Sequence, residues 1–520
     1  MFSKIFPGPL IIDYGPSDIQ EEEVYLLTEL NGKNFYRRNG ADNSTKYLDV
    51  WALENLAITA SHWNSGFGTK FIETPISFYL ISYLNASSSQ MAALKGLCDL
   101  PPTLKFLYGM LNDGNTFLGY RRKPWLFIGW ISFVMINYCL YTEGEPGLEL
   151  TIMMMFIARS CVQMSEVVHD TLCAERGNLE SNSTRGFFMT TTHTVKAFGC
   201  VIGAILGALL FNKPIWGWGI SISKVFLIQA SLPLFTILAC WHMIEISSGY
   251  QTPSFRFQVL SMWSTLKLRA VWQPMIFVFT YNFLQVPNVA FKNFLVKGLG
   301  FENFELGLLL VGATVFGWLG LIIYREYFLG FSWRDIYIWT TIIGFFCSLM
   351  QIVLAYRWNQ DLGIPDLYFA IGDEATAVLV EKVHSMPTRI MYITLISERR
   401  IGEINVGGCE GAIFSLLISI TSIGYVFGSA FGGILSEICN INNESLSAGD
   451  FSGVAKLTIA LAFIRILPLS LVYLLPDTRE EQRALFSHGG SSVMGGGVLI
   501  ITLLTGVILA VLCDFYFIYQ

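Results

Sequence analysis

The sequence predicts an all-α polytopic membrane protein, and three observations support this prediction. Of the 520 residues, 53% are hydrophobic and only 14% are charged, whereas an ordinary soluble domain carries about 25% charged residues. The mean hydropathy is +0.51. The apolar residues form repeated runs of about 20 residues or more, each long enough to cross a hydrocarbon core of roughly 30 Å. Too few charges remain to coat a water-exposed surface.

We expect twelve membrane-crossing helices and then a thirteenth. The twelve cover residues 55–85, 88–113, 123–142, 149–176, 185–211, 222–246, 271–298, 303–327, 333–357, 366–397, 408–439 and 451–476. The thirteenth run, Val493 to Tyr519, is rich in glycine at first and then almost wholly apolar. Twelve crossings form the standard core of a membrane carrier, so the thirteenth is expected to be a peripheral addition.

Lysine and arginine residues indicate which side of the membrane each loop faces. The N-terminal tail and every second loop hold most of these cations, so we expect a cytosolic N-terminus. The expected divisions are a cytosolic tail at 1–53, a six-helix bundle at 54–246, a cytosolic linker at 247–270, a second six-helix bundle at 271–478, a cytosolic loop at 479–492 and the additional helix at 493–519. No cleavable signal or organelle-targeting pattern is evident, so the plasma membrane is the expected location.

The expected helices differ in polarity with a period of three. The third, sixth and ninth are nearly uncharged, whereas the first, fourth, seventh and tenth are polar. Ionisable groups in hydrocarbon cost several kcal/mol unless they face a bundle interior or water, so the polar helices are expected to line a cavity. A three-helix period repeated four times is the organisation of nested inverted repeats, which hold a solute near the membrane midplane. The pattern therefore favours a carrier.

The fourth helix carries the densest group of ionisable residues. Arg159, Glu166 and Asp170 are spaced seven and four residues apart, so they lie on one stripe of the helix. A buried carboxylate beside a cation suits a group that loads and releases one proton in each transport cycle. A structural ion pair that locks this helix to a neighbour explains the same residues equally well. Glu381 in the tenth helix is a third candidate for proton coupling.

Further polar residues inside the expected helices are candidates for solute binding. Together with Arg159 they are Lys70, Glu73, Lys105, Lys196, Tyr281, Gln285, Asn288, Lys292 and Lys382. The residues from Tyr281 to Lys292 are spaced so that they form a single stripe on one continuous helix. Because so many of these side chains are cations, we expect an anionic or zwitterionic solute.

Other classes of function find little support. The ten cysteines are scattered singly, without a CxxC or histidine-linked cluster, so no metal or other cofactor is expected. No HExxH or GxSxG motif indicates an enzyme, and no filter-like loop indicates a channel. The expected partners are a small molecule, protons and the lipid bilayer, with no nucleic acid. A non-transporting solute sensor of the same fold stays open as an alternative.

The junction between the second and third helices carries a distinctive motif. Asp113 closes one apolar run, a glycine turn follows, and Arg121 and Arg122 open the next run. This junction resembles the cytoplasmic connection between helices 2 and 3 in transporters of the major facilitator type. Asp113 is then expected to bond the other bundle while the arginines hold acidic partners, so that these contacts gate the cavity. A simple positive-inside anchor is the alternative.

Three stretches together resemble the folate-biopterin transporter family. The first runs from Gln90 through Leu100-Pro101, Lys105 and Tyr108-Gly109 to Asp113 and Gly119-Tyr120-Arg121-Arg122. The second is Glu166-Val-Val-His-Asp170, which has glutamate where the family pattern usually begins with aspartate. The third is Gly408-Cys-Glu410-Gly411, which continues to Ser419 and adds Glu410 to the gating candidates. The Cys-Pro that commonly precedes this Glu-Gly is absent here.

The resemblance covers roughly residues 55–480 and carries expectations about fold and function. It implies a major facilitator fold of two six-helix bundles, and uptake of folates, biopterin or related pteridines coupled to protons. Lysine or arginine would bind the glutamate tail of a folate, and aromatic rings would stack on its flat ring system. Relatives that carry other metabolites, including S-adenosylmethionine, keep a second cargo open.

Overall fold

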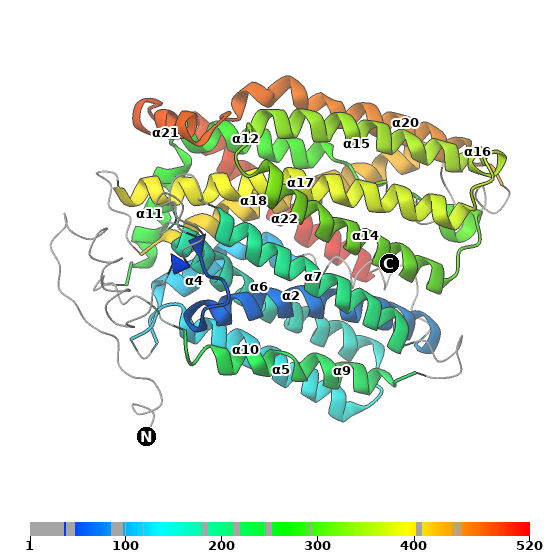
Figure 1. Ribbon diagram of the computed structural model, residues 1–520, viewed down its shortest axis with the longest axis horizontal. Coiled ribbons are helices and arrows are strands. Elements are labelled where there is room, and N and C mark those ends of the chain that lie inside the picture. Colours follow the sequence, from blue (N-terminus) through cyan, green and yellow to red (C-terminus); the bar gives the residue numbers. More distant parts are fainter. Residues whose placement is uncertain are drawn as a thin grey trace.

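The computed structural model is a bundle of long helices that lie roughly along one axis (Figure 1). The structure describes residues 36–37, 47–84, 97–98, 100–117, 119–177, 180, 186–211, 219–243, 245, 252–288, 290–291, 294–401, 408–439, 441, 446 and 449–519. Two short strands, β1 (Tyr36–Arg37) and β2 (Tyr47–Leu48), pair antiparallel ahead of the first helix. The remaining regular structure of the described residues is helical.

The helices of the N-terminal half lie together on one side of the molecule (Figure 1). They are α2 (Leu53–Phe78) with its π-helical extension η2 (Tyr79–Tyr83), α4 (Lys105–Gly114), α5 (Lys123–Glu143), α6 (Leu148–Gly177), α7 (Phe187–Leu210), α9 (Ile222–Ser231) and α10 (Pro233–Ala239). Pro233 separates α9 from α10 because its ring occupies the first position of a new helix. Together α9 and α10 form the sixth expected crossing.

The helices of the C-terminal half occupy the other side. They are α12 (Arg269–Leu284), η3 (Phe294–Gly298), α14 (Asn303–Ile323) with η4 (Tyr324–Phe328), α15 (Trp333–Ala355), α16 (Trp358–Asp361), α17 (Asp366–Ile401), α18 (Glu410–Ile438) and α20 (Ser452–Ile466) with η5 (Leu467–Leu474). The two halves meet where α7 packs against α14 and where α4 packs against α18.

The expected seventh crossing at 271–298 is not one continuous helix. Helix α12 ends at Leu284, and Gln285 to Asn288 are not helical. Pro287 explains the break, since proline has no backbone N–H and disfavours helical geometry in the residue before it. The single polar stripe expected from Tyr281 through Gln285 and Asn288 is therefore wrong. Lys292, its last member, lies outside the described residues.

Two segments expected as connections contain helices, and the thirteenth helix is present. Helix α11 (Phe255–Leu266) lies within 247–270, and α21 (Arg479–His488) lies within 479–492. Helix α22 (Val493–Tyr519) packs against α12 and α18 of the C-terminal half. Its glycines allow this approach, because a Cβ on Gly495 would lie 2.6 Å from the Trp272 ring.

Eight helices of the described residues are long and apolar enough to cross a membrane. They are α5, α6, α7, the α9–α10 pair, α14 with η4, α15, α18, and α20 with η5. Helices α2, α4, α12 and α17 fall outside this set. These four correspond to the expected first, second, seventh and tenth crossings, three of which are among the polar ones. The sequence prediction of an all-α, multi-pass membrane protein is confirmed.

Candidate functional site

Glu166 on α6 is a buried carboxylate that pairs with two lysines. It accepts hydrogen bonds from Ser65 on α2, from Lys105 Nζ on α4 at 3.0 Å and from Lys196 Nζ on α7 at 2.7 Å. Glu166 and Lys105 are buried, whereas the side chain of Lys196 is 25% exposed. Four helices thus converge on one carboxylate, and one of its two lysines keeps access to the surroundings.

Neighbouring charges extend this group along α2 and α6. Arg159, two turns before Glu166, donates from Nη1 to the hydroxyl of Thr69 at 3.2 Å. Lys70 and Glu73 form their own ion pair of 2.8 Å, and their side chains are 29% and 48% exposed. The structure therefore brings Lys105, Lys196 and Arg159 together around Glu166, whereas Lys70 and Glu73 form a pair of their own.

Asp170, one turn beyond Glu166, lies among histidine rings instead of lysines. Its Oδ1 atom lies 3.6 Å from His62 Nε2, 3.7 Å from His169 Nε2 and 3.8 Å from His193 Nε2. All four side chains are buried. His62 was not among the candidates, because its contact with Asp170 joins α2 to α6 and no spacing along the chain indicates it. Glu166 and Asp170 share a stripe of α6 but occupy different surroundings.

The candidates of the C-terminal half form separate small groups. The Tyr281 hydroxyl lies 3.1 Å from Thr341 Oγ1, and Asn288 Nδ2 donates to Gln351 and to Thr458. Gln285 Nε2 is buried without a hydrogen-bond partner in the described part of the chain. Glu381 and Lys382 pair with each other at 2.9 Å, with side chains 44% and 38% exposed.

One hydrogen bond joins α17 of the C-terminal half to the histidines of the N-terminal half. Arg389 Nη1 lies 3.4 Å from His193 Nε2. Side chains of the two halves therefore face each other across the α7 and α17 region, as the expected position of a solute between bundles requires.

The gating candidates form a network that we call the latch, made of Asp113, Arg121, Arg122, Glu175 and Glu410. Asp113 pairs with Arg122, and its other oxygen accepts the backbone N–H of Ala412 at 2.6 Å. Arg121 pairs with Glu410 at 2.9 Å and with Glu175 at 3.3 Å. Because Glu410 and Ala412 begin α18, the latch joins the two halves of the molecule.

Charge and helix geometry both favour the closed latch. Asp113 is fully buried and accepts a backbone N–H in the first turn of α18, where the helix dipole stabilises a negative charge. Burial alone would lower the pKa of Arg121, but the carboxylates of Glu410, Asp113 and Glu175 raise this pKa above its ordinary value. Arg121 therefore stays charged, and the latch holds together as a set of opposite charges.

Two acidic residues of this region were not among the sequence candidates. Glu175 on α6 pairs with Arg122 at 3.0 Å. Its position in the acidic segment after Asp170 was the feature of the sequence that could have indicated it. Glu245 accepts the backbone N–H groups of Arg121, Arg122 and Lys123 at 2.7–2.9 Å, so it caps the start of α5. No local sequence pattern indicates this cap, since Glu245 is more than a hundred residues from the start of α5 in the sequence.

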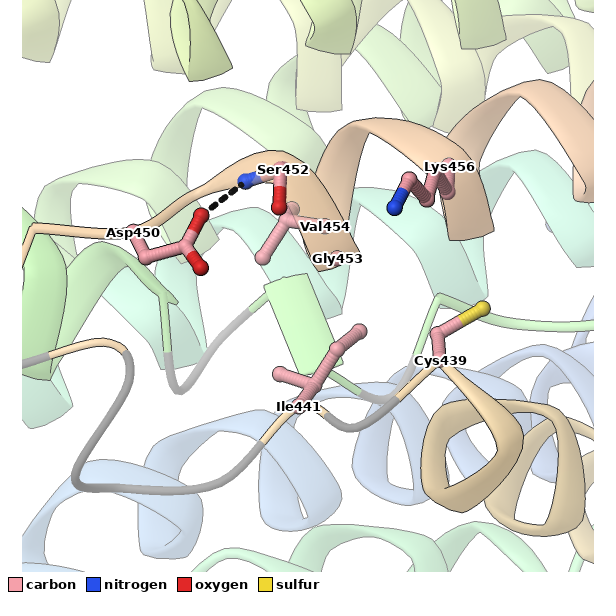
Figure 2. A pocket seen from close by; sticks show the side chains of 7 residues that line it. All are labelled: Cys439, Ile441, Asp450, Ser452, Gly453, Val454 and Lys456. Carbon is pink, nitrogen blue, oxygen red and sulfur yellow. Dashed lines mark hydrogen bonds between the residues drawn. The ribbon is translucent and has the colours of Figure 1, made fainter.

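A small cavity of about 220 Å³ lies at the opposite end of the C-terminal half, between the end of α18 and the start of α20. Figure 2 shows Asp450 hydrogen-bonded to the backbone N–H of Ser452, with Lys456 further along α20. The hydrogen bonds from Ser452 lower the pKa of Asp450. The lining residues are Cys439, Ile441, Asp450, Ser452, Gly453, Val454 and Lys456. None of the predicted binding residues is among them.

Solved structures of membrane transporters share this fold. The human organic anion transporter MFSD10 (TETRAN) matches with a TM-score of 0.54 and 14% identity, covering 81% of this chain and 99% of that chain. The E. coli fucose:proton symporter FucP matches with a TM-score of 0.51 and 11% identity, covering 80% of this chain and 99% of that chain. The chain therefore has the fold of these transporters.

Residues 65–485 match the BT1 family, and the chain belongs to this family. The folate-biopterin transporter of Synechocystis sp. is 27% identical over 406 residues, which are 77% of this chain and 77% of that relative. The family resemblance predicted from the three sequence stretches is confirmed.

Proposed function

We propose that this chain is a secondary active transporter that moves folate, biopterin or related pteridines by alternating access, together with protons. The observation that carries the proposal is the Glu166 site, where two lysines share one carboxylate and Lys196 stays partly exposed. The relative from Synechocystis sp. bears the name folate-biopterin transporter, which agrees with the cargo class.

The balance of charge around Glu166 supports an anionic cargo. Lys105, Lys196 and Arg159 gather around one carboxylate, and the Arg159 guanidinium donates to the neutral hydroxyl of Thr69. Buried charge is costly unless it is paired, so a cationic surplus favours a solute that supplies carboxylates. The glutamate tail of a folate supplies two, whereas biopterin would depend on ring contacts.

The sharing of Lys196 offers a route to proton coupling. When a carboxylate of the solute binds the exposed Lys196, Glu166 loses one of its two cations and its negative charge is less well compensated. Loss of a neighbouring cation raises the affinity of a carboxylate for a proton. Solute binding and proton binding at Glu166 then favour each other, which is the requirement for symport.

The latch supports the alternating-access part of the proposal. It ties the start of α18 to α4 and α5, so solute can leave at that end only after the buried Asp113 and Arg122 separate from α18. The positive charges of Arg121 and Arg122 mark this end as cytosolic. In this proposal the N-terminus is also cytosolic and the protein works in the plasma membrane.

Uptake of radiolabelled folate into proteoliposomes tests the proposal. We expect wild-type uptake to be blocked by excess unlabelled folate, biopterin or methotrexate. Lys196→Gln should lower folate uptake at least tenfold because it removes the exposed cation. The matched control is Lys224→Gln, which changes an exposed lysine at the start of α9 and should leave uptake unchanged.

Three outcomes would overturn parts of the proposal. Equal folate uptake by Lys196→Gln and wild type would remove Lys196 from the binding site. Uptake of S-adenosylmethionine without uptake of folate would support a transporter but contradict folate as its solute. Saturable folate binding by correctly inserted protein without any flux would indicate a solute sensor.

A further inference from the structure

Three side chains from three helices converge at the centre of the N-terminal half. His62 on α2, Asp170 on α6 and His193 on α7 each direct one ligand atom to the same point, and these atoms all lie within 4.8 Å of one another. The residues are 0%, 2% and 5% exposed. Two imidazoles and a carboxylate thus meet in a region shielded from solvent.

The hydrogen bonds of the two histidines show that unprotonated nitrogens face this point. His62 Nδ1 lies 2.9 Å from the backbone carbonyl of Ile58, so it carries the proton and leaves Nε2 as an acceptor. The Cys173 thiol lies 3.9 Å from the same Nε2. His193 Nε2 lies 3.4 Å from Arg389 Nη1, and a guanidinium can only donate, so this nitrogen is also an acceptor.

The third atom at this point is an acceptor as well. Asp170 Oδ1 lies 3.6 Å from His62 Nε2 and 3.8 Å from His193 Nε2, and within the described ranges no donor lies within 3.5 Å of it. Three lone-pair-bearing atoms therefore face one another in a buried place. Such an arrangement is unfavourable unless cations compensate it. Arg389 compensates His193 alone, whereas a metal ion between the three atoms would compensate all of them.

The spacing of these atoms favours a metal ion over a bridging proton. A charge-assisted N–H···O bond spans about 2.7–2.9 Å, so 3.6 and 3.8 Å are too long for a shared proton. Atoms bound to one zinc ion at about 2.0–2.1 Å lie roughly 3.3 Å apart in a tetrahedron and up to about 4.2 Å apart in wider geometries. The distances from Asp170 Oδ1 to the two histidine nitrogens fall within that range, and all three atoms lie within 4.8 Å of one another.

The surrounding residues complete the pattern of a metal site. Metal-bound histidines usually donate their other ring nitrogen to a backbone carbonyl or carboxylate, as His62 does toward Ile58. His169 lies beside this group, with its Nε2 atom 3.7 Å from Asp170 Oδ1, but it does not belong to the set of three converging atoms. Imidazole and carboxylate ligands suit zinc and similar divalent transition metals.

We propose that His62, Asp170 and His193 bind a divalent transition-metal ion of the zinc class inside the N-terminal bundle. Arg389 of the C-terminal half occupies the lone pair of His193 that the metal would use. The metal and Arg389 therefore compete for one nitrogen, so metal binding releases this contact between α7 and α17. None of the three proposed ligands is a hydrogen-bond partner of Glu166, so the proposed site does not depend on the nature of the cargo.

Zinc titration of the purified full-length chain tests this inference. After treatment with a chelator, the wild type should bind one equivalent of Zn²⁺ in competition with a fluorescent zinc indicator. His62→Gln and His193→Gln should each weaken binding at least tenfold, since loss even of a ligand's supporting partner costs about 10–100-fold. Arg389→Gln should bind Zn²⁺ more tightly than wild type because the competing guanidinium is gone.

His384→Gln is the matched control. His384 is also a buried helical histidine whose Nδ1 lies 3.1 Å from the carbonyl four residues earlier, but among the described residues it belongs to no cluster of metal-ligating atoms. This variant should keep the full zinc affinity. Each variant is first checked for a monodisperse, helical protein, and X-ray absorption of the zinc-bound wild type should show nitrogen and oxygen ligands.

Several results would overturn the proposal. They are the absence of a stoichiometric zinc site in the wild type, equal affinity in wild type and His62→Gln, and a zinc spectrum dominated by sulfur. The X-ray absorption spectrum of the zinc-bound wild type tests the nitrogen and oxygen ligands even if a histidine variant fails to fold. None of these results bears on folate uptake, so the proposed transport function is tested separately.

Discussion

At the scale of single residues, Glu166 and Asp170 illustrate how one helix stripe supports two kinds of chemistry. Glu166 meets Ser65, Lys105 and Lys196, so its charge is compensated by cations. Asp170 lies one turn away, near imidazoles only 3.6–3.8 Å distant. The sequence left proton coupling and structural pairing open for both residues. The ion pairs of Glu166 are now established, and its coupling role is a proposal.

Glu166→Gln should flatten the pH dependence of uptake. A symporter takes up solute faster when the external pH falls, because the proton is a second substrate, and a glutamine has no proton to load. Solute exchange between two loaded faces needs no net proton movement, so counterflow should persist. Initial rates between about pH 5.5 and 7.5 would check this, with Glu143→Gln at the exposed end of α5 as the control.

The same substitution has a structural cost that the experiment must separate. Removing one partner of a buried ion pair destabilises a protein by about 3–5 kcal/mol, and Lys105 is buried beside Glu166. Protein lost from the membrane would favour the purely structural role. A folded variant that retains the wild-type pH profile would contradict proton loading at Glu166.

Asp113→Asn should reach the membrane but transport at least tenfold more slowly than wild type. The amide loses the charge that pairs with Arg122 and weakens the acceptor for the Ala412 N–H. The closed state of the latch is then less populated, and the cycle stalls. Surface labelling measures how much protein reaches the membrane, and initial uptake rates measure transport. The control is Asp335→Asn, which changes an exposed residue in the first turn of α15. Uptake at the wild-type rate by correctly localised Asp113→Asn would contradict the gating role of the latch. The junction would then serve only as a positive-inside anchor.

At the scale of elements, close helix packing depends on small residues. A Cβ on Gly203 of α7 would lie 2.5 Å from the Phe67 carbonyl of α2, and Gly199 and Gly207 are equally close to the same helix. Between the two halves, a Cβ on Gly109 of α4 would lie 2.7 Å from the Gly411 carbonyl of α18. Small residues of this kind let helix backbones approach each other in membranes.

Gly109→Val should disfavour the latched state without unfolding either bundle. The added side chain meets backbone atoms of α18 that cannot move alone, so the latch end opens more often. A cysteine at Leu111, which is 43% exposed, should then react faster with a membrane-impermeant thiol reagent. Gly372→Val is the control, since nothing lies within 4 Å of a Cβ at that position on α17. Equal labelling rates in both variants would contradict the gate at α4 and α18.

The elements were largely predictable because apolar runs and their flanking charges are local signals. The breaks within the helices were harder to predict. Helix α12 ends at Leu284, shortly before Pro287, although the spacing of the polar residues predicted one continuous helix. The helices within 247–270 and 479–492 were missed because they are short and border the membrane helices. Local sequence reports whether a segment is apolar, whereas the exact end of a helix depends on prolines, caps and neighbours.

At the scale of the whole molecule, the candidate site joins residues that are far apart in the sequence. Motif resemblance placed Asp113, the two arginines and Glu410 in the gate, and the structure brings all four together. The roles of His62 and Glu245 were out of reach, because their contacts exist only after α2 packs on α6 and after α10 reaches the start of α5. Partners on different helices leave no spacing pattern along the chain.

The most direct test of this account measures folate and proton movement at the same time in proteoliposomes that contain a pH-sensitive dye. An inward folate gradient imposed without a pH gradient should acidify the lumen of liposomes with wild-type protein. Glu166→Gln should abolish this acidification. Folate entry through the wild type without any change in luminal pH would contradict proton-coupled transport, however well the fold and family agree.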